Sequence, residues 1–145
     1  MYRHILVATD GSELAGKAVS AGLALAKALG SKVTVVTVTE PWRGRVTGEA
    51  AFGLPATEFA KLADEQAAHV LEAVAAMAAE AGVAVSRLHV KDHYPADGVL
   101  RAAEDAACDL IVMASHGRRG LERLLLGSET VRVLTQSKVP VLVCR

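Results

Sequence analysis

Short apolar runs alternate with amphipathic helical segments along the whole chain, and this alternation limits the fold more than any other feature. Five runs rich in Val, Ile, Leu and Thr have the length of strands, and the four segments between them have apolar residues at helical spacing. The alternation predicts an α/β fold, in which right-handed crossovers build a parallel sheet with helices on both faces. Strands are expected at 4–9, 33–38, 83–90, 110–114 and 139–144, and helices at 12–29, 57–81, 95–107 and 127–138.

The composition of the runs also indicates where each strand lies. The runs at 4–9 and 110–114 are nearly continuous in apolar residues, which is typical of central strands buried on both faces. Pro140 lies in the last run and cannot donate to an internal ladder, so this run is expected at an edge of the sheet. At 145 residues the chain fits one domain spanning 1–145.

Charge and hydropathy disfavour several classes of partner. Sixteen basic and sixteen acidic side chains cancel, so nucleic acid and anionic membranes are not expected as partners. The apolar runs are far shorter than the ~20 residues of a membrane helix, so neither a membrane helix nor a signal peptide is expected. Cys108 and Cys144 are expected as separate reduced thiols, and the cytoplasm is the expected location.

Polar and glycine-rich segments follow two of the expected strands. In open α/β sheets, ligands bind beyond the carboxyl ends of the strands, where the strand order reverses. If the first and fourth strands are neighbours, the segments 8–12 and 113–117 line that crevice. Gly127 and Ser128 open the last helix, whose free N–H groups favour a phosphate. The chain has neither a Walker A motif nor the Gly-x-Gly-x-x-Gly fingerprint.

Four of these features together resemble the universal stress protein family over nearly the whole chain. They are Asp10, the loop 115–117, Gly127-Ser128 and the closing run 139–143. ATP-binding members carry Gly-x2-Gly-x9-Gly-Ser/Thr, and here Ala114 replaces the first glycine. The added methyl costs little if residue 114 is extended, but it would weaken binding if the family glycine has a positive φ or touches the ligand.

The resemblance implies an open five-stranded parallel sheet of order 3-2-1-4-5, Rossmann-like and similar to the adenine nucleotide alpha hydrolases. It also implies that the chain binds ATP, with Mg²⁺ accompanying the nucleotide, as a sensor or switch in the stress response. A homodimer is implied, formed by pairing of the last strands through Val139, Val141 and Val143, and such pairing would cover an apolar edge. The regulated protein partner is not implied by any residue.

By the same resemblance, thirteen residues would surround the nucleotide. Ala8, Thr9 and Val38 would border the nucleoside, and Asp10 would face the ribose and the phosphate or metal. The ribose and phosphates would be followed by Met113, Ala114, Ser115, His116 and Gly117. The phosphate end would be held by Gly127, Ser128, Glu129 and Thr130, with the side chain of Glu129 turned away.

Other interpretations of these residues stay open. Asp10, Ser12 and Ser128 are also typical helix caps, so the turns could exist without a ligand. Arg118 and Arg119 are as consistent with a solvated loop as with phosphate contacts.

Two further classes of function are the alternatives. The chain could be a homodimeric interaction scaffold without nucleotide, for which Ala114 is the distinguishing feature. It could instead be an ATP-consuming enzyme, but the sequence assigns no catalytic residue. No protein-held metal is expected either, because His89 and His93 lack further ligands. The long loop 40–57, with Trp42, is interpreted as a lid or a surface excursion.

Overall fold

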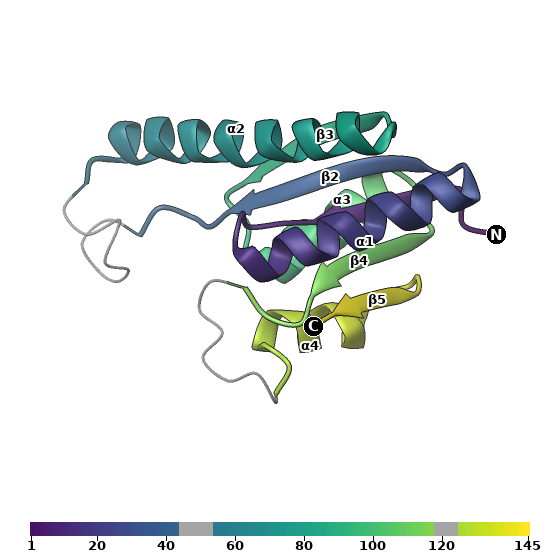
Figure 1. Cartoon of the computed structure of the whole chain (residues 1–145). Helices are drawn as coiled ribbons and strands as arrows, with labels where there is room; N and C mark the ends of the chain where they lie inside the picture. The colour runs from purple at the N-terminus through teal and green to yellow at the C-terminus, as the bar shows by residue number, and fades with distance from the viewer. Residues whose placement is uncertain (44–53, 118–124) are drawn as a thin grey trace.

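The computed structural model describes residues 1–43, 54–117 and 125–145, and its elements follow the predicted alternation (Figure 1). The middle of the predicted loop and the arginine pair at 118–119 lie outside the described residues. The elements are β1 (His4–Ala8), α1 (Glu13–Leu29), β2 (Lys32–Thr39), α2 (Ala56–Ala81), β3 (Val85–Lys91), α3 (Pro95–Asp105), β4 (Leu110–Ala114), α4 (Ser128–Gln136) and β5 (Val141–Cys144).

The five strands form one parallel sheet of order β3-β2-β1-β4-β5, which confirms the predicted order. β1 lies at the centre, with Leu6 opposite Thr34 of β2 on one side and Ile111 of β4 on the other. β5 is an edge strand, as expected, and it begins directly after Pro140. The order reverses between β1 and β4, so the carboxyl ends of these two strands are neighbours.

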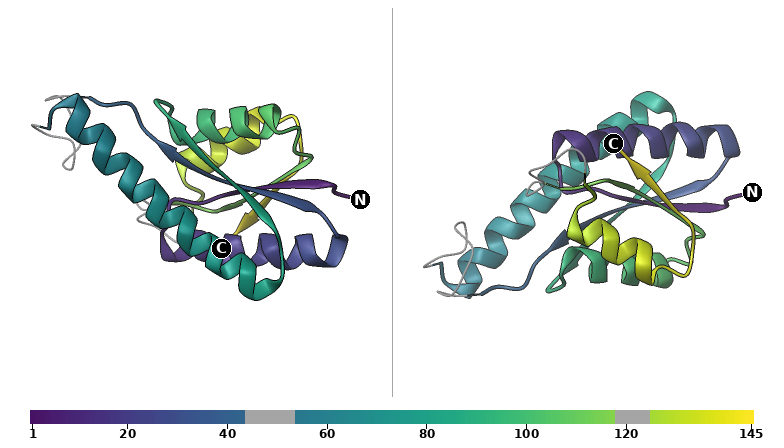
Figure 2. Two further views of the ribbon diagram at one scale, coloured as in Figure 1. Left: turned by 90° about the horizontal axis from the view of Figure 1, so that it is seen from above. Right: turned by 90° about the horizontal axis from the view of Figure 1, so that it is seen from below.

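Two helices cover each face of the sheet (Figure 2). Alternate residues of the central strands point to opposite faces, so each strand contributes to two cores. The core beneath α1 and α2 is formed by residues that include Ile5, Val7, Val19, Leu71 and Val112. The core beneath α3 and α4 is formed by residues that include Leu6, Val36, Val99, Ile111 and Val133.

Several predicted boundaries were wrong by two residues, each for a local reason. The last helix ends at Gln136, because Ser137 is extended (φ −67°, ψ 136°) and its hydroxyl donates to the carbonyl of Val139. β5 therefore starts at Val141 and not at 139. The helix predicted over 95–107 ends at Asp105, because Ala107 adopts a positive φ of 52°.

The amino-terminal part of α2 extends beyond the sheet, as Figures 1 and 2 show. The buried residues of this helix begin only at Ala67. The indole N–H of Trp42 donates to the carbonyl of Leu54 at 3.0 Å, so the two ends of the predicted loop meet at its base. Among the described helices, α2 included, none combines the length and apolarity needed to cross a membrane. Both cysteines are free, as predicted.

Candidate functional site

The segments that follow β1 and β4 meet at the carboxyl edge of the sheet. A Cβ atom placed on Gly117 would lie 2.5 Å from Oδ2 of Asp10, so only a hydrogen fits between this backbone and the carboxylate. The sheet pairing of β1 with β4 brings the two segments together. The two segments expected to line a ligand crevice are therefore neighbours, and the Asp10 carboxylate packs directly against the backbone of Gly117.

The turn between β1 and α1 holds Asp10 by hydrogen bonds to the backbone. Oδ1 of Asp10 accepts from the N–H of Ser12 at 2.9 Å, while Thr9 Oγ1 accepts from the N–H of Gly11 at 3.1 Å. Gly11 has φ 80°, a left-handed conformation that suits glycine. Ser12 caps α1 by accepting from the N–H of Ala15 at 3.3 Å, so the capping role holds for Ser12. Asp10 stabilises the turn that precedes the cap.

The end of β4 is attached to both β5 and α4. Ser115 donates its N–H to the carbonyl of Cys144 at 2.7 Å and accepts at its own carbonyl from the N–H of Gly127 at 2.8 Å. The hydroxyl of Thr130 donates to the carbonyl of Ala114 at 3.1 Å. Ser115 and Thr130 are buried, so both residues fix the scaffold at the predicted phosphate end.

The amino terminus of α4 lies directly against the loop after β4. Gly127 is the N-cap residue and Ser128 the first helical residue, so Ser128 does not act as the cap. Among the described residues, no side chain caps this end of α4. A Cβ on Gly127 would approach Cβ of His116 to 3.0 Å and Cα of His116 to 3.2 Å. The positive end of α4 is thus brought next to the loop by a glycine, and its N-cap residue offers it no side-chain acceptor.

Ala114 occupies its position without backbone strain. It is the last residue of β4 and pairs with Cys144 in β5. Among the described non-glycine residues, only Asp92 and Ala107 have a positive φ. The methyl of Ala114 is buried in the core beneath α1 and α2. The backbone at 114 therefore does not require a glycine.

The residues predicted to border the nucleoside lie at the ends of β1 and β2. Ala8 and Val38 are half-buried and pack on the core beneath α3 and α4, and Met113 is buried in the same core. Val38 contacts α3 closely, because a Cβ on Gly98 would lie 2.7 Å from either methyl of Val38. Gly98 thus sets the position of α3 against β2, a role that its place within a helical pattern did not reveal.

His116 has one nitrogen that is not satisfied. Within the described residues, its Nδ1 is the one buried side-chain nitrogen or oxygen without a hydrogen-bond partner. Buried polar atoms are rarely left unpaired in native proteins. Cα and Cβ of His116 lie beside Gly127, at the predicted phosphate end.

A charged cluster at the same edge was missed by sequence reasoning. Oε2 of Glu129 accepts from the backbone N–H of Ala96 at 2.7 Å, and Arg132 lies 3.1 Å from the Asp97 carboxylate. The i, i+3 spacing of Glu129 and Arg132 could have indicated the weaker pair between them, at 3.6 Å. The contacts with α3 could not be found before the adjacency of α3 and α4 was known.

The two histidines considered as metal ligands have other partners. Nε2 of His89 lies 2.7 Å from Thr39 Oγ1, and Nδ1 of His93 lies 2.7 Å from the carbonyl of Lys91. Over the ranges 1–43, 54–117 and 125–145, no three His, Cys, Asp or Glu residues are grouped to hold a metal ion.

Lys91 also contributes to the pKa shifts of two neighbouring groups. It contacts Asp64 at 2.6 Å, and this hydrogen bond holds the pKa of Asp64 below its usual value. Burial, with a contribution from the positive charge of Lys91, lowers the pKa of His89 against the opposing effect of Asp64. The three residues tie α2 to β3 at the carboxyl edge.

Comparison with known proteins supplies a family context. The model of the universal stress protein family matches residues 1–145. Universal stress protein MJ0531 of Methanocaldococcus jannaschii is 33% identical over 147 residues, which cover 100% of this chain and 83% of the relative. The solved structure of protein MJ0577 from the same organism has a TM-score of 0.82 at 30% identity and covers 99% of this chain and 96% of its own. A universal stress protein solved in complex with cAMP has a TM-score of 0.75 at 25% identity, with 99% and 97% covered.

Proposed function

Because this chain belongs to the universal stress protein family, we propose that it binds ATP with Mg²⁺ at the carboxyl edge of its sheet. Binding acts as a sensor or switch in the stress response and does not start efficient catalysis. The observation that carries the proposal is the meeting of Asp10 and Gly117 beside the amino terminus of α4. The family relative solved with cAMP supports an adenine nucleotide as the class of ligand.

The chemistry of the edge fits a nucleoside polyphosphate. Backbone N–H groups at the start of α4 and the partial positive charge of that helix end favour phosphate oxygens. Gly117 and Gly127 let the loop after β4 pack closely against Asp10 and against the start of α4, which brings these groups together. Asp10 supplies a carboxylate of the kind that Mg²⁺ prefers among protein ligands. The ends of β1 and β2, at Ala8 and Val38, offer apolar surface to the nucleoside.

Thermal unfolding with and without Mg-ATP tests the proposal. A ligand at a hundred times its dissociation constant stabilises the native state by about 2.7 kcal/mol, which raises the melting temperature of a domain of this size by roughly 5 to 10 °C. Asp10→Ala and Gly117→Val variants should lose this shift. Equal melting temperatures of the wild-type protein with and without Mg-ATP would contradict the proposal and favour an interaction scaffold.

The homodimer belongs to the same proposal, and the open edge of β5 supports it. The carbonyls of Pro140 and Cys144 accept hydrogen bonds from Ile111 and Ser115 of the β4 segment. Alternate residues of a strand turn their peptide groups to opposite sides, so the peptide groups of Val141 and Val143 face away from β4. An antiparallel copy of β5 would satisfy them. A monomeric mass by light scattering at micromolar concentration would contradict this part.

A further inference from the structure

The amino-terminal turns of α3 and α4 are joined by a charged hydrogen bond. Glu129 is the second residue of α4, and its Oε2 accepts from the N–H of Ala96, the second residue of α3, at 2.7 Å. Pro95 has no N–H, so Ala96 provides the first amide of α3. Ala96 is fully buried, and a carboxylate on a buried helix-terminal amide is a strong contact.

Two further contacts reinforce this link. Arg132, one turn further along α4, has its Nη2 3.1 Å from Oδ1 of Asp97 in the first turn of α3. Its Nη1 lies 3.6 Å from Oε1 of Glu129. The two carboxylates and the guanidinium therefore connect the first turns of both helices, and the charge of Glu129 is directed to α3.

The link continues from α3 to the end of β2. Gly98 of α3 lies against Val38 at the end of β2, close enough that a Cβ would approach the methyl groups of Val38 to 2.7 Å. The contacts from α4 through Glu129, Ala96 and Gly98 to Val38 join the phosphate end of the proposed site to its nucleoside end. Nothing else described at this edge ties α3 to the first turn of α4 by a hydrogen bond to the backbone.

We propose that Glu129 is a positioning residue for the nucleotide site. Its carboxylate holds the first turn of α4 at a fixed place relative to α3, and so fixes the uncapped amides of α4 at the distance from β2 that a nucleotide spans. This inference rests on the proposed function. Glu129 acts through Ala96, not by touching the ligand with its carboxylate.

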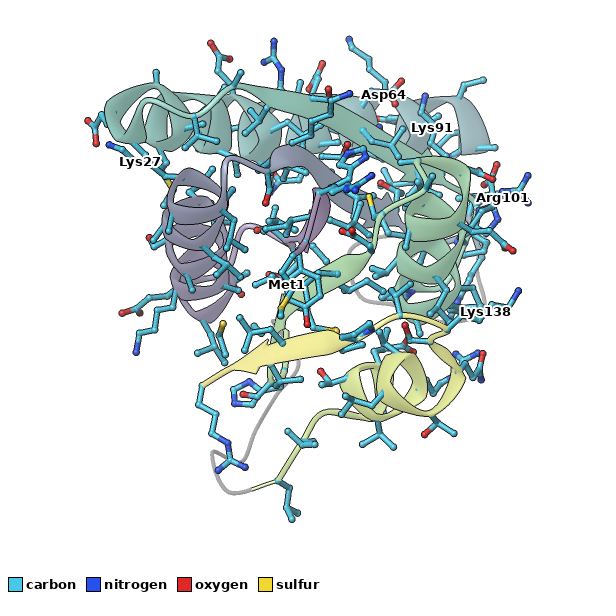
Figure 3. The ribbon with its side chains drawn as sticks, turned by 90° about the vertical axis from the view of Figure 1, so that its right-hand side faces the viewer. Met1, Lys27, Asp64, Lys91, Arg101 and Lys138 are labelled. Atoms are coloured by element: carbon cyan, nitrogen blue, oxygen red, sulfur yellow. The ribbon has the colours of Figure 1, made fainter. Side chains whose placement is uncertain are left out.

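The chain offers a matched control at the opposite edge of the sheet. Lys138, just after α4, pairs with Glu104 of α3 at 3.1 Å, and both side chains are exposed. Figure 3 views the molecule from that edge, with Lys138 labelled beside α3 and α4. Glu104→Ala breaks a contact between α3 and the segment after α4 without loosening the ends that face the site.

The experiment compares the wild-type protein with Glu129→Ala, Glu129→Gln and Glu104→Ala by two measurements. In the absence of nucleotide, amide hydrogen exchange at Ala96 is followed by NMR. Exchange should accelerate on the order of tenfold or more in Glu129→Ala, because a hydrogen bond to a charged group is lost. It should stay near the wild-type rate in Glu129→Gln, whose amide oxygen still accepts from Ala96, and in Glu104→Ala.

Calorimetry then measures the affinities for Mg-ATP and for adenosine. Glu129→Ala should bind ATP about five- to tenfold more weakly and adenosine nearly unchanged, since only ATP reaches the displaced turn of α4. Glu129→Gln should restore ATP binding to within about twofold, and Glu104→Ala should resemble the wild type. A general loss of stability would weaken both ligands and would not be rescued by glutamine.

Three results would overturn the inference. They are unchanged ATP affinity in Glu129→Ala, an equal loss for adenosine, and an equal loss in Glu104→Ala. Absence of ATP binding by the wild-type protein would instead refute the proposed function, and with it the ligand role of Glu129. The exchange rate of Ala96 would still show whether Glu129 links the two helices.

Discussion

Replacing Gly127 by alanine tests whether the start of α4 holds the phosphates. The backbone angles of Gly127 are φ −61° and ψ 151°, which alanine adopts without strain, so the effect must come from space alone. The new Cβ would lie 3.0 Å from Cβ of His116, 3.2 Å from its Cα and 3.3 Å from the carbonyl oxygen of Ser115. Two of these three atoms are backbone, so side-chain rotation alone does not relieve the contact.

The start of α4 must therefore move away from the loop after β4 by a few tenths of an ångström. That movement strains the 2.8 Å hydrogen bond from the N–H of Gly127 to Ser115. Overpacking of this kind costs about 1–3 kcal/mol of the free energy of unfolding. Because the amides of Ser128 and Glu129 move with the helix, ATP affinity should fall by about tenfold or more, equivalent to about 1.4 kcal/mol.

Urea denaturation and calorimetry with Mg-ATP measure the two effects separately. Gly16→Ala is the control without steric contact, because a Cβ there meets nothing within 4 Å. This substitution should stabilise α1 by up to about 1 kcal/mol. Gly22→Ala is the control for stability, since its Cβ would lie 2.7 Å from Cγ2 of Val7 in the core. It should destabilise the protein yet bind ATP within about twofold of the wild type. If Gly127→Ala is destabilised but binds ATP as well as Gly22→Ala does, the phosphates do not bind at the start of α4.

Three more changes have expected outcomes. His89 has a lowered pKa in the folded protein, so the unfolded chain binds more protons and the free energy of unfolding should fall as the pH drops through 6.5. Urea denaturation at about pH 7.5 and 5.5 measures this fall, which should be smaller in His89→Gln than in the wild type. Val143→Pro removes an N–H from the open edge of β5 but none that is directed to β4. Light scattering should therefore report monomers for this variant where the wild type gives dimers. Persistence of the dimer would argue against pairing through β5. Ala114→Gly should lower the free energy of unfolding by about 1 kcal/mol and change ATP affinity by less than about twofold, since the methyl group of Ala114 lies in the core beneath α1. A large gain in ATP affinity, measured by calorimetry, would show that this methyl group intrudes on the ligand.

The order of the elements and of the strands could be predicted because both depend on local pattern. Apolar continuity identified β1 and β4 as central strands, and Pro140 placed β5 at the edge. Glycines near helix ends were informative as well, since Gly30 and Gly82 end α1 and α2 with positive φ. Boundaries near 106 and 138 were less predictable, because a single left-handed residue or a serine side chain decides where those helices end.

The candidate site was predictable only where one segment supplies both the residue and its role. Asp10 and Gly127 follow a strand or open a helix, and those positions alone indicate a ligand edge. The partners of these residues come from elsewhere in the chain: Gly117 against Asp10, Ser115 against Gly127, and Ala96 against Glu129. Such pairs exist only after the sheet has brought β1, β4 and the two helices together.

The same distinction predicts that alanine is tolerated at one glycine position of the motif and not at another. Ala114 lies inside β4, where the strand fixes an extended backbone and α1 provides a core for the methyl. Gly127 lies where the backbones of two segments approach closely, and a side chain there would press against His116 and the carbonyl of Ser115. Glycine at 127 is therefore needed because two segments of the chain approach closely there, and not because of its own backbone conformation. Ala114→Gly and Gly127→Ala should consequently differ in their effect on ATP affinity, even though each changes the chain by a single methyl group.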